Sequence, residues 1–125
     1  MDYIRDCAQR VFERFGYGLD TRVYIDALKV ALQLEEQMLE ENRSWPMTYD
    51  GFSIGHDVSA DLVVNQEVVI LVRSDDEDFE WNAPDMRRLL KFSGIPKGII
   101  INFGTSKLDV TEFSLDDSYH IKRSS

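Results

Sequence analysis

The fold of this chain is decided by residues 68–103, which read VVILVRSDDEDFEWNAPDMRRLLKFSGIPKGIIINF. The stretch opens with a β-branched run, 68–72, and closes with a nearly all-apolar run, 98–103. Between them, apolar side chains recur at helical spacing, at Met86, Leu89, Leu90 and Phe92. A continuous apolar run is typical of a strand covered on both faces. Because strand–helix–strand connections close right-handed with parallel strands, the stretch predicts a βαβ unit in which the helix spans 84–93.

Two further helices are expected ahead of this unit. Apolar residues spaced three and four apart predict a helix over residues 2–15, which stops at Gly16-Tyr17-Gly18. A second pattern of the same period begins near Asp20 or Thr21, both competent N-caps, and runs to about Asn42. The glycine-rich segment therefore predicts a corner between two helices.

The segment after the second helix is expected to form hairpins. Asp50-Gly51 lies between short β-type runs at 47–49 and 52–54, and Asn65-Gln66-Glu67 separates the runs 60–64 and 68–72. Residues 108–113 predict an edge strand, and residues 114–125 a loose tail. The expected order is α-α-β-β-β-β-α-β, an α/β sandwich on a mixed sheet, with residues 1–113 forming a single domain.

The composition is that of a folded protein. Of the 125 residues, 43% are hydrophobic and 11% aromatic, which excludes a disordered chain. The 14 Lys and Arg against 23 Asp and Glu give a formal net charge of −9. Because nucleic-acid binding needs clustered Lys and Arg that displace counterions, this excess of negative charge argues against nucleic acid as a partner.

The expected location is cytoplasmic, with no membrane partner. Cys7 is the sole cysteine, so no intrachain disulfide can form. The N-terminus places Asp2 and Asp6 where a signal peptide carries basic residues, and it lacks an apolar core. No apolar run approaches the ~20 residues that span a bilayer.

Three stretches resemble the GxxExxY family. They read GYGLDTRVY at residues 16–24, ADLVV at 60–64 and GIIINFG at 98–104, in the order and spacing of that family. The family is similar to a small branch of the PD-(D/E)XK nuclease superfamily, and the resemblance covers roughly residues 2–110. It implies a restriction-endonuclease-like α/β sandwich with a mixed central sheet.

The resemblance also implies a metal-dependent chemistry. Carboxylates from neighbouring strands hold one or two Mg²⁺ ions in such a site, and a lysine two residues after the second acid helps to activate water. Strand residues i and i+2 point to the same face, so the acid and the lysine converge on the metal. A glutamate on the early helix and a glutamine on the later helix complete the family pattern.

This chain has lost most of that chemistry. The helix glutamate falls on Thr21, the first strand acid on Asp61, the second on Leu71, the lysine on Arg73 and the glutamine on Asp85. Leu71 cannot ligate a hard cation, and the guanidinium of Arg73 does not release a proton to act as a base. The simplest arrangement left is an Asp61–Arg73 ion pair. We interpret these positions as a dismantled site with no catalytic residue, metal or cofactor.

A rebuilt metal site is the alternative. Asp61 is then the first Mg²⁺ ligand, joined by migrated acids drawn from Asp20, Asp57, Glu67 and Asp85. Asp20 is also explained as an N-cap, and Asp85 as a negative charge in the first turn of its helix. Under this alternative the protein is a divergent Mg²⁺-dependent nuclease.

An acidic loop directly follows the strand that ends at Arg73. It contains the consecutive acids Asp75, Asp76, Glu77 and Asp78, and the aromatic residues Phe79 and Trp81 come next. Such a loop is most often a solvated segment, but it can also repel or imitate phosphate while the aromatic side chains anchor a protein. We therefore expect a non-catalytic module that contacts an unknown protein partner or a second copy of itself.

Overall fold

Six strands form one mixed sheet in the computed structural model, which describes residues 2–74, 79–115 and 121–124. The strands lie side by side in chain order: β1 (Leu39–Tyr49), β2 (Phe52–Val64), β3 (Val68–Arg73), β4 (Lys97–Asn102), β5 (Asp109–Ser114) and β6 (Ile121–Ser124). β3 and β4 are parallel, and the other neighbouring pairs are antiparallel. The mixed sheet and the βαβ unit predicted from the sequence are confirmed.

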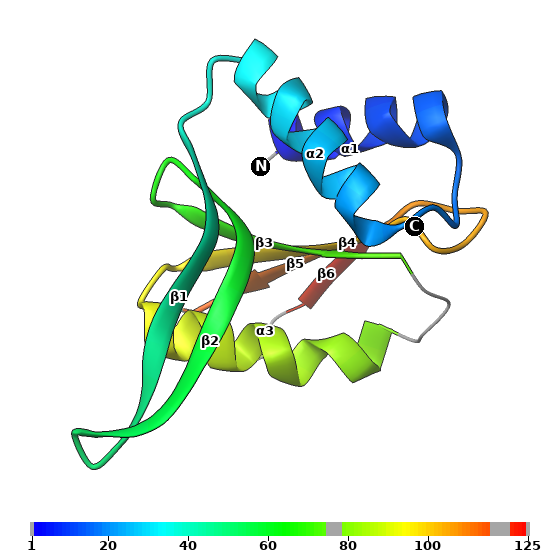
Figure 1. Ribbon diagram of the computed structural model, residues 1–125. Coiled ribbons are helices and arrows are strands. Elements are labelled where there is room, and N and C mark those ends of the chain that lie inside the picture. Colours follow the sequence, from blue (N-terminus) through cyan, green and yellow to red (C-terminus); the bar gives the residue numbers. More distant parts are fainter. Residues whose placement is uncertain (1, 75–78, 116–120, 125) are drawn as a thin grey trace.

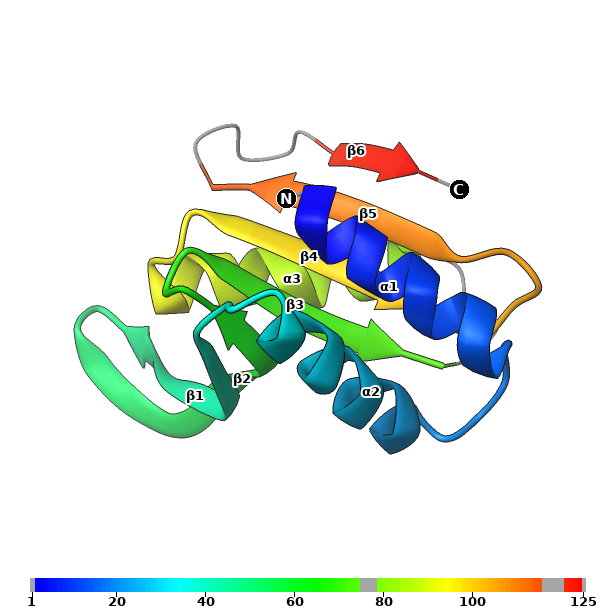
Figure 2. The same cartoon turned by 90° about the horizontal axis from the view of Figure 1, so that it is seen from above.

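Helices cover the sheet on both faces (Figure 1 and Figure 2). α1 (Asp2–Phe15) and α2 (Thr21–Leu34) lie on one face, and α3 (Phe79–Ser93) lies on the other. The alternation of side chains along β3 serves both layers. Ile70 and Val72 belong to the apolar cluster under α1 and α2, while Val69 and Leu71 belong to the cluster under α3. The α/β class is therefore confirmed.

Close packing of α3 on β4 depends on Gly98. A Cβ atom at this position would lie 2.3 Å from the sulfur of Met86 and 3.2 Å from Cδ2 of Leu90. Met86 is fully buried and cannot swing away into solvent. The glycine therefore lets the helix approach the strand more closely than any side chain would allow.

The two tight turns form where the sequence predicts them. Asp50 and Gly51 have φ values of 50° and 84° between β1 and β2. Asn65 and Gln66 have φ values of 53° and 59° between β2 and β3. Positive φ at both residues of the Asp50-Gly51 turn is the geometry that two-residue hairpin loops favour, whereas Asn65 and Gln66 belong to a three-residue loop between Val64 and Val68.

The second helix is shorter than its sequence pattern predicts. It ends at Leu34 rather than near Asn42, and Glu36 takes a left-handed φ of 61°. Glu41, expected in the helix, lies in β1 and pairs with Leu62 of β2. Good helix formers become a strand here because pairing with β2 outweighs their local propensity.

Other element boundaries also differ from expectation. The runs 52–54 and 60–64 belong to the single long strand β2, so three strands rather than four precede α3. α3 begins at Phe79 instead of near residue 84. β5 is not an edge strand, because β6 pairs with it from Phe113↔Ile121 to Val110↔Ser124. The segment 114–125, expected to be a loose tail, thus contains a strand.

The longest helix, α3, has 15 residues. Among the residues that the structure describes, no helix is both long and apolar enough to cross a membrane.

Candidate functional site at the Arg73 cleft

A glycine corner, residues 16–19, joins α1 to α2. Gly16 and Gly18 have φ values of 72° and 85°, which residues with a Cβ rarely adopt. The N–H of Gly16 closes α1 by donating to the carbonyl of Phe12 at 2.8 Å. Asp20 then caps α2, its Oδ1 accepting from the N–H of Arg22 at 2.9 Å. The expected corner and the N-cap are both present.

Tyr24 holds the glycine corner together from the inside. Its side chain is fully buried and stacks on Phe103, with ring centroids 4.3 Å apart and the planes 3° from parallel. The hydroxyl donates to the carbonyl of Gly16 at 2.8 Å and accepts from the N–H of Leu19 at 3.1 Å. A buried phenol with both hydrogen bonds made avoids the desolvation penalty of an unpaired hydroxyl.

The glycine corner is bonded to the strand ends that carry Arg73. The N–H of Gly18 donates to the carbonyl of Phe103 at 3.1 Å, and the N–H of Phe103 donates to the carbonyl of Arg73 at 2.8 Å. The hydroxyl of Ser74 also donates to the carbonyl of Leu19. These bonds place the start of α2 beside the carboxyl ends of β3 and β4.

Asp61 lies where β2 separates from β3. Backbone pairing between the two strands covers Leu62 to Val64, and Asp61 is the residue of β2 that directly precedes this paired stretch. Its Oδ2 accepts a hydrogen bond from the N–H of Val72 at 2.8 Å. Val72 is fully buried, so its N–H needs a partner. The carboxylate therefore takes the place of a strand carbonyl and has a structural role.

Leu71 points toward α3. Its side chain is 5% exposed and belongs to the apolar cluster that includes Met86 and Leu89. The family that the sequence resembles has a metal-binding carboxylate at this position. The apolar neighbours of Leu71 under α3 instead stabilise an aliphatic side chain, which itself supplies no oxygen ligand.

Arg73 lies between two carboxylates on the α3 side of the sheet. Its Nη1 is 3.8 Å from Oδ2 of Asp61, and its Nη2 is 3.9 Å from Oδ2 of Asp85. Asp85 also accepts a shorter bond from Nη2 of Arg88, at 2.7 Å. The Arg73 side chain is 25% exposed, so water screens these long pairs and each stabilises the fold only weakly.

A small cleft, which we call the Arg73 cleft, opens beside these residues. It encloses about 250 Å³ and is lined by residues of β1, β2, β3 and α3, namely Met47, Asp57, Val58, Ser59, Leu71, Arg73, Asp85, Arg88 and Leu89. Two carboxylates and two guanidiniums line the same space, so its formal charge is balanced. Within residues 2–74, 79–115 and 121–124, no group of three or more His, Cys, Asp or Glu side chains is placed to hold a metal ion.

The structure brings together four of the five site positions named from the sequence. Leu71, Arg73 and Asp85 line the Arg73 cleft, and Asp61 contacts Arg73 from β2. Thr21 is the first residue of α2, which packs on the other face of the sheet.

Two groups of candidates have different outcomes. Of the migrated acids, Asp57 and Asp85 line the cleft, whereas Asp20 is engaged as the N-cap of α2. The interaction candidates Asp75, Asp76, Glu77 and Asp78 lie outside the described residues, as do the side chains of Phe79 and Trp81.

Sequence reasoning missed part of the cleft wall. Arg88 could have been predicted from the sequence, because Asp85 and Arg88 are three residues apart on a helix and can form an ion pair. Met47 and Ser59 could not have been predicted, since only the course of the β1–β2 hairpin over α3 brings them to the cleft beside Arg73.

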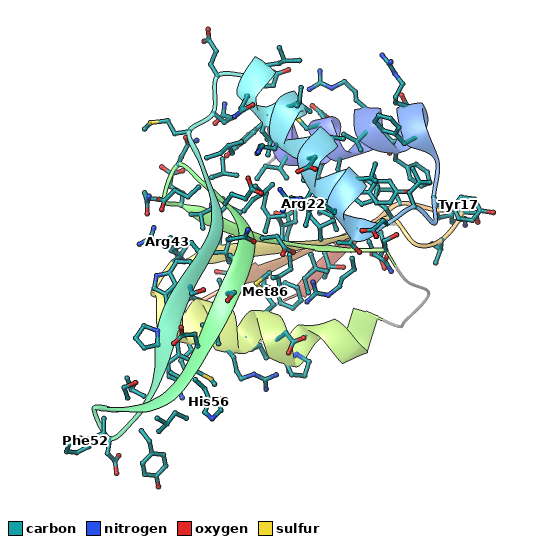
Figure 3. The ribbon with its side chains drawn as sticks, in the orientation of Figure 1. Tyr17, Arg22, Arg43, Phe52, His56 and Met86 are labelled. Atoms are coloured by element: carbon teal, nitrogen blue, oxygen red, sulfur yellow. The ribbon has the colours of Figure 1, made fainter. Side chains whose placement is uncertain are left out.

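A charged cluster of Arg22, Lys29 and Glu41 fastens α2 to β1, and Figure 3 labels Arg22 on α2. Glu41 of β1 accepts from the ammonium of Lys29 at 2.9 Å and also from the guanidinium of Arg22. The hydrogen bond from Lys29, and next the one from Arg22, hold the pKa of Glu41 below its ordinary value. Arg22 is thereby engaged on the surface of α2 rather than at the Arg73 cleft.

The comparison with known proteins gives one match. A family model described as the PD-(D/E)XK nuclease superfamily matches residues 1–113, a range that spans the glycine corner, the Arg73 cleft and all elements up to Phe113 in β5. No curated protein and no solved structure matches the chain.

Proposed function

Since the chain belongs to the PD-(D/E)XK nuclease superfamily, we propose that it is a member whose metal centre has been dismantled and that it acts through contacts with another protein. Within the superfamily we assign it to the GxxExxY group, with Gly18, Thr21 and Tyr24 at the three named positions of that pattern. In this proposal the protein works in the cytosol and uses no metal or cofactor.

The burial of Leu71 is the observation that carries the proposal. Mg²⁺ requires oxygen ligands, and a side chain that is 5% exposed among apolar neighbours supplies none. Leu71 lines the Arg73 cleft but is packed against the apolar cluster under α3, so the cleft wall at this position is a hydrocarbon surface without a ligand atom.

The remaining charges also fit Mg²⁺ poorly. Asp61 already accepts from the N–H of Val72, and the guanidinium of Arg73 lies 3.8 Å from the same oxygen. A fixed positive charge beside the one carboxylate that keeps its type repels a divalent cation. Arg73 cannot serve as the base that activates water, since a guanidinium stays protonated in proteins. The residues present therefore do not fit the superfamily's metal chemistry.

A cleavage assay tests the proposal directly. Purified wild type is incubated with single- and double-stranded DNA and RNA in the presence of Mg²⁺ or Mn²⁺, with Asp61→Ala as the matched control. We expect no difference between the two proteins. Cleavage by the wild type that disappears in Asp61→Ala overturns the proposal, whereas cleavage that survives in both points to a contaminant.

A restored variant tests the physical reason. The double substitution Leu71→Glu with Arg73→Lys returns an acid and a lysine to the positions of the superfamily pattern. We expect this variant to bind Mn²⁺ measurably better than wild type in isothermal titration calorimetry. The matched control is Leu71→Gln with Arg73→Lys, which has the same shape without the added carboxylate. Wild type that binds Mn²⁺ as tightly as the restored variant contradicts the proposal.

A divergent Mg²⁺-dependent nuclease remains the second candidate, because Asp57 and Asp85 line the same cleft. In that function Asp61 acts with these two migrated acids. Asp57→Ala and Asp85→Ala distinguish the candidates in the same cleavage assay. Loss of an existing activity in both variants, as well as in Asp61→Ala, supports the nuclease.

A further inference from the structure

The β1–β2 hairpin ends in an apolar patch that its own chain leaves uncovered. The patch, which we call the hairpin tip, consists of Tyr49, Phe52 and Ile54, whose side chains are 72%, 77% and 51% exposed. Tyr49 and Phe52 are direct cross-strand partners, so their side chains lie next to each other. Asp50 in the turn adds one negative charge between them. Figure 3 shows Phe52 at the far end of the hairpin.

A second apolar surface lies between α1 and α2. This surface, which we call the α1–α2 groove, encloses about 420 Å³ and is lined by Arg10, Val11, Arg14, Phe15, Ala27, Val30, Ala31, Leu34 and Glu35. Phe15, Val30 and Leu34 are 47%, 53% and 79% exposed, although they are large apolar side chains. Such a concentration of exposed apolar surface is typical of an interaction site.

The charges at the groove favour an acidic partner. Arg10 is engaged with Glu35, at 3.0 Å between Nη2 and Oε1, so that pair is internally balanced. Arg14, an exposed residue in the last turn of α1, adds a positive charge. An occupant that combines large apolar side chains with one carboxylate therefore matches the groove in both chemistry and charge.

We propose that the hairpin tip of one copy of this chain occupies the α1–α2 groove of a second copy. Tyr49, Phe52 and Ile54 supply the apolar side chains, and Asp50 supplies the carboxylate that faces Arg14. The tip cannot reach the groove of its own chain, since the hairpin extends past α3 while α1 and α2 lie on the opposite face of the sheet (Figure 1). The inference rests on the proposed function, whose partner it identifies.

Symmetry constrains how such a contact closes. The hairpin tip and the α1–α2 groove are different surfaces, so a single contact is heterologous and leaves a free tip and a free groove at the ends. The hairpin extends past α3 and the groove lies on the α1–α2 face, so the free tip and the free groove of one copy face different neighbours (Figure 1). Copies therefore add head to tail rather than closing into a reciprocal dimer.

Analytical ultracentrifugation of single variants and of their mixture tests the contact. We expect wild type to form head-to-tail oligomers that grow with protein concentration. Phe52→Asp disables the tip, and Val30→Asp disables the groove; both side chains are more than half exposed, so the fold is retained. Each substitution is expected to weaken self-association at least about 30-fold, the loss typical of a hot-spot side chain.

Mixing the two variants is the decisive measurement. Phe52→Asp keeps an intact groove, and Val30→Asp keeps an intact tip, so an equimolar mixture retains one good contact per pair. We expect a heterodimer in the mixture where each variant alone is monomeric. Met38→Asp is the control, because Met38 is 78% exposed but belongs to neither surface. Asp50→Asn, which keeps a residue suited to φ 50°, is expected to weaken wild-type self-association only a few-fold.

Several results overturn the inference. Wild type that stays monomeric at its highest soluble concentration assigns the two surfaces to other partners. Self-association that survives both substitutions places the interface elsewhere, and a mixture that stays monomeric excludes the tip-to-groove geometry. The cleavage assay judges the proposed function separately: an oligomer that cleaves nucleic acid refutes the dismantled site, whereas an inactive monomer refutes only the tip-to-groove contact.

Discussion

The glycine corner and the Arg73 cleft lie at the same end of the sheet but are held in different ways. At the corner, the ring of Tyr24 stacks on Phe103 at 4.3 Å and its hydroxyl makes two hydrogen bonds of 2.8 and 3.1 Å. At the cleft, Arg73 reaches its two carboxylates only at 3.8 and 3.9 Å and is partly exposed. The corner is stabilised by burial and complete hydrogen bonding, whereas the cleft combines long, screened ion pairs with shorter bonds, among them the one from Nη1 of Arg73 to the carbonyl of Val72 at 3.0 Å.

The difference shows which of the two regions determines the stability of the fold. The corner positions α2 and the ends of β3 and β4, so changes there are felt by the whole fold. The charged residues of the cleft are partly exposed, so substitutions of Arg73, Asp85 or Arg88 change the chemistry of the cleft with little effect on stability. The framework of the fold therefore tolerates changes at these charged positions.

The largest expected effect comes from Tyr24. Tyr24→Ala removes a fully buried ring and is expected to lower the free energy of unfolding by about 3–5 kcal/mol. Tyr24→Phe keeps the stacking on Phe103 and removes only the hydroxyl, so a smaller loss of about 1–3 kcal/mol is expected. Urea denaturation followed by circular dichroism measures both. Equal losses in the two variants would show that stacking contributes nothing to the corner.

Asp61 lies beside the cleft but, like Tyr24 at the corner, hydrogen-bonds a backbone group, so its contribution to stability tests the comparison. Asp61→Ala leaves the buried N–H of Val72 without its acceptor, so we expect a loss of about 1–3 kcal/mol in unfolding free energy. Asp61→Asn retains an oxygen that can accept the same bond, and it should lose clearly less. If the two variants are equally stable, the bond to Val72 is not what Asp61 contributes.

Arg73 should show the smallest change in stability among these three residues. Arg73→Met removes the charge but keeps much of the apolar stem, and we expect a change of no more than about 1 kcal/mol. The same urea titration provides the value. A loss above that of Tyr24→Phe would mean that the cleft is as strongly determined as the corner, which contradicts the comparison.

A pH series refines the comparison at the contact between α2 and β1. The pKa of Glu41 is lowered in the folded state, so its ionised form stabilises the fold above the unfolded-state pKa of about 4.3. This contribution is lost as the pH falls through the folded-state pKa. The stability difference between wild type and Glu41→Gln should therefore be constant at neutral pH and shrink on acidification. A difference that grows in acid reverses the sign and excludes this role for Glu41.

Much of the fold could be predicted from local patterns in the sequence. α1 spans the residues that its apolar spacing predicts, and Asp50-Gly51 forms the expected turn. The second helix shows where such patterns fail. Residues around Glu41 favour a helix by propensity, yet they form β1 because a partner strand lies beside them. Propensities of a few tenths of a kcal/mol per residue are too small to resist a complete strand ladder.

The candidate site could be predicted only in part from the sequence, for a similar reason. Asp61, Arg73 and Asp85 could be proposed together because the resemblance to the GxxExxY family assigns them to positions of one site. The bond from the N–H of Val72 to Asp61 could not, since it depends on β2 leaving β3 at that point. The approach of Met47 and Ser59 to the cleft likewise depends on how a long hairpin crosses α3.

The sequence by itself determined that this chain forms an α/β fold, that a glycine corner separates its first two helices, and that residue 71 in the apolar strand is a leucine. These properties are local, because they depend on side-chain type and on spacing along the chain. The tertiary structure alone decided that Asp61 completes a sheet, that Leu71 faces a core, and that the hairpin tip and the α1–α2 groove are both left exposed. Those properties join residues far apart in sequence, and only the packing of helices and strands into layers brings such residues together or keeps them apart.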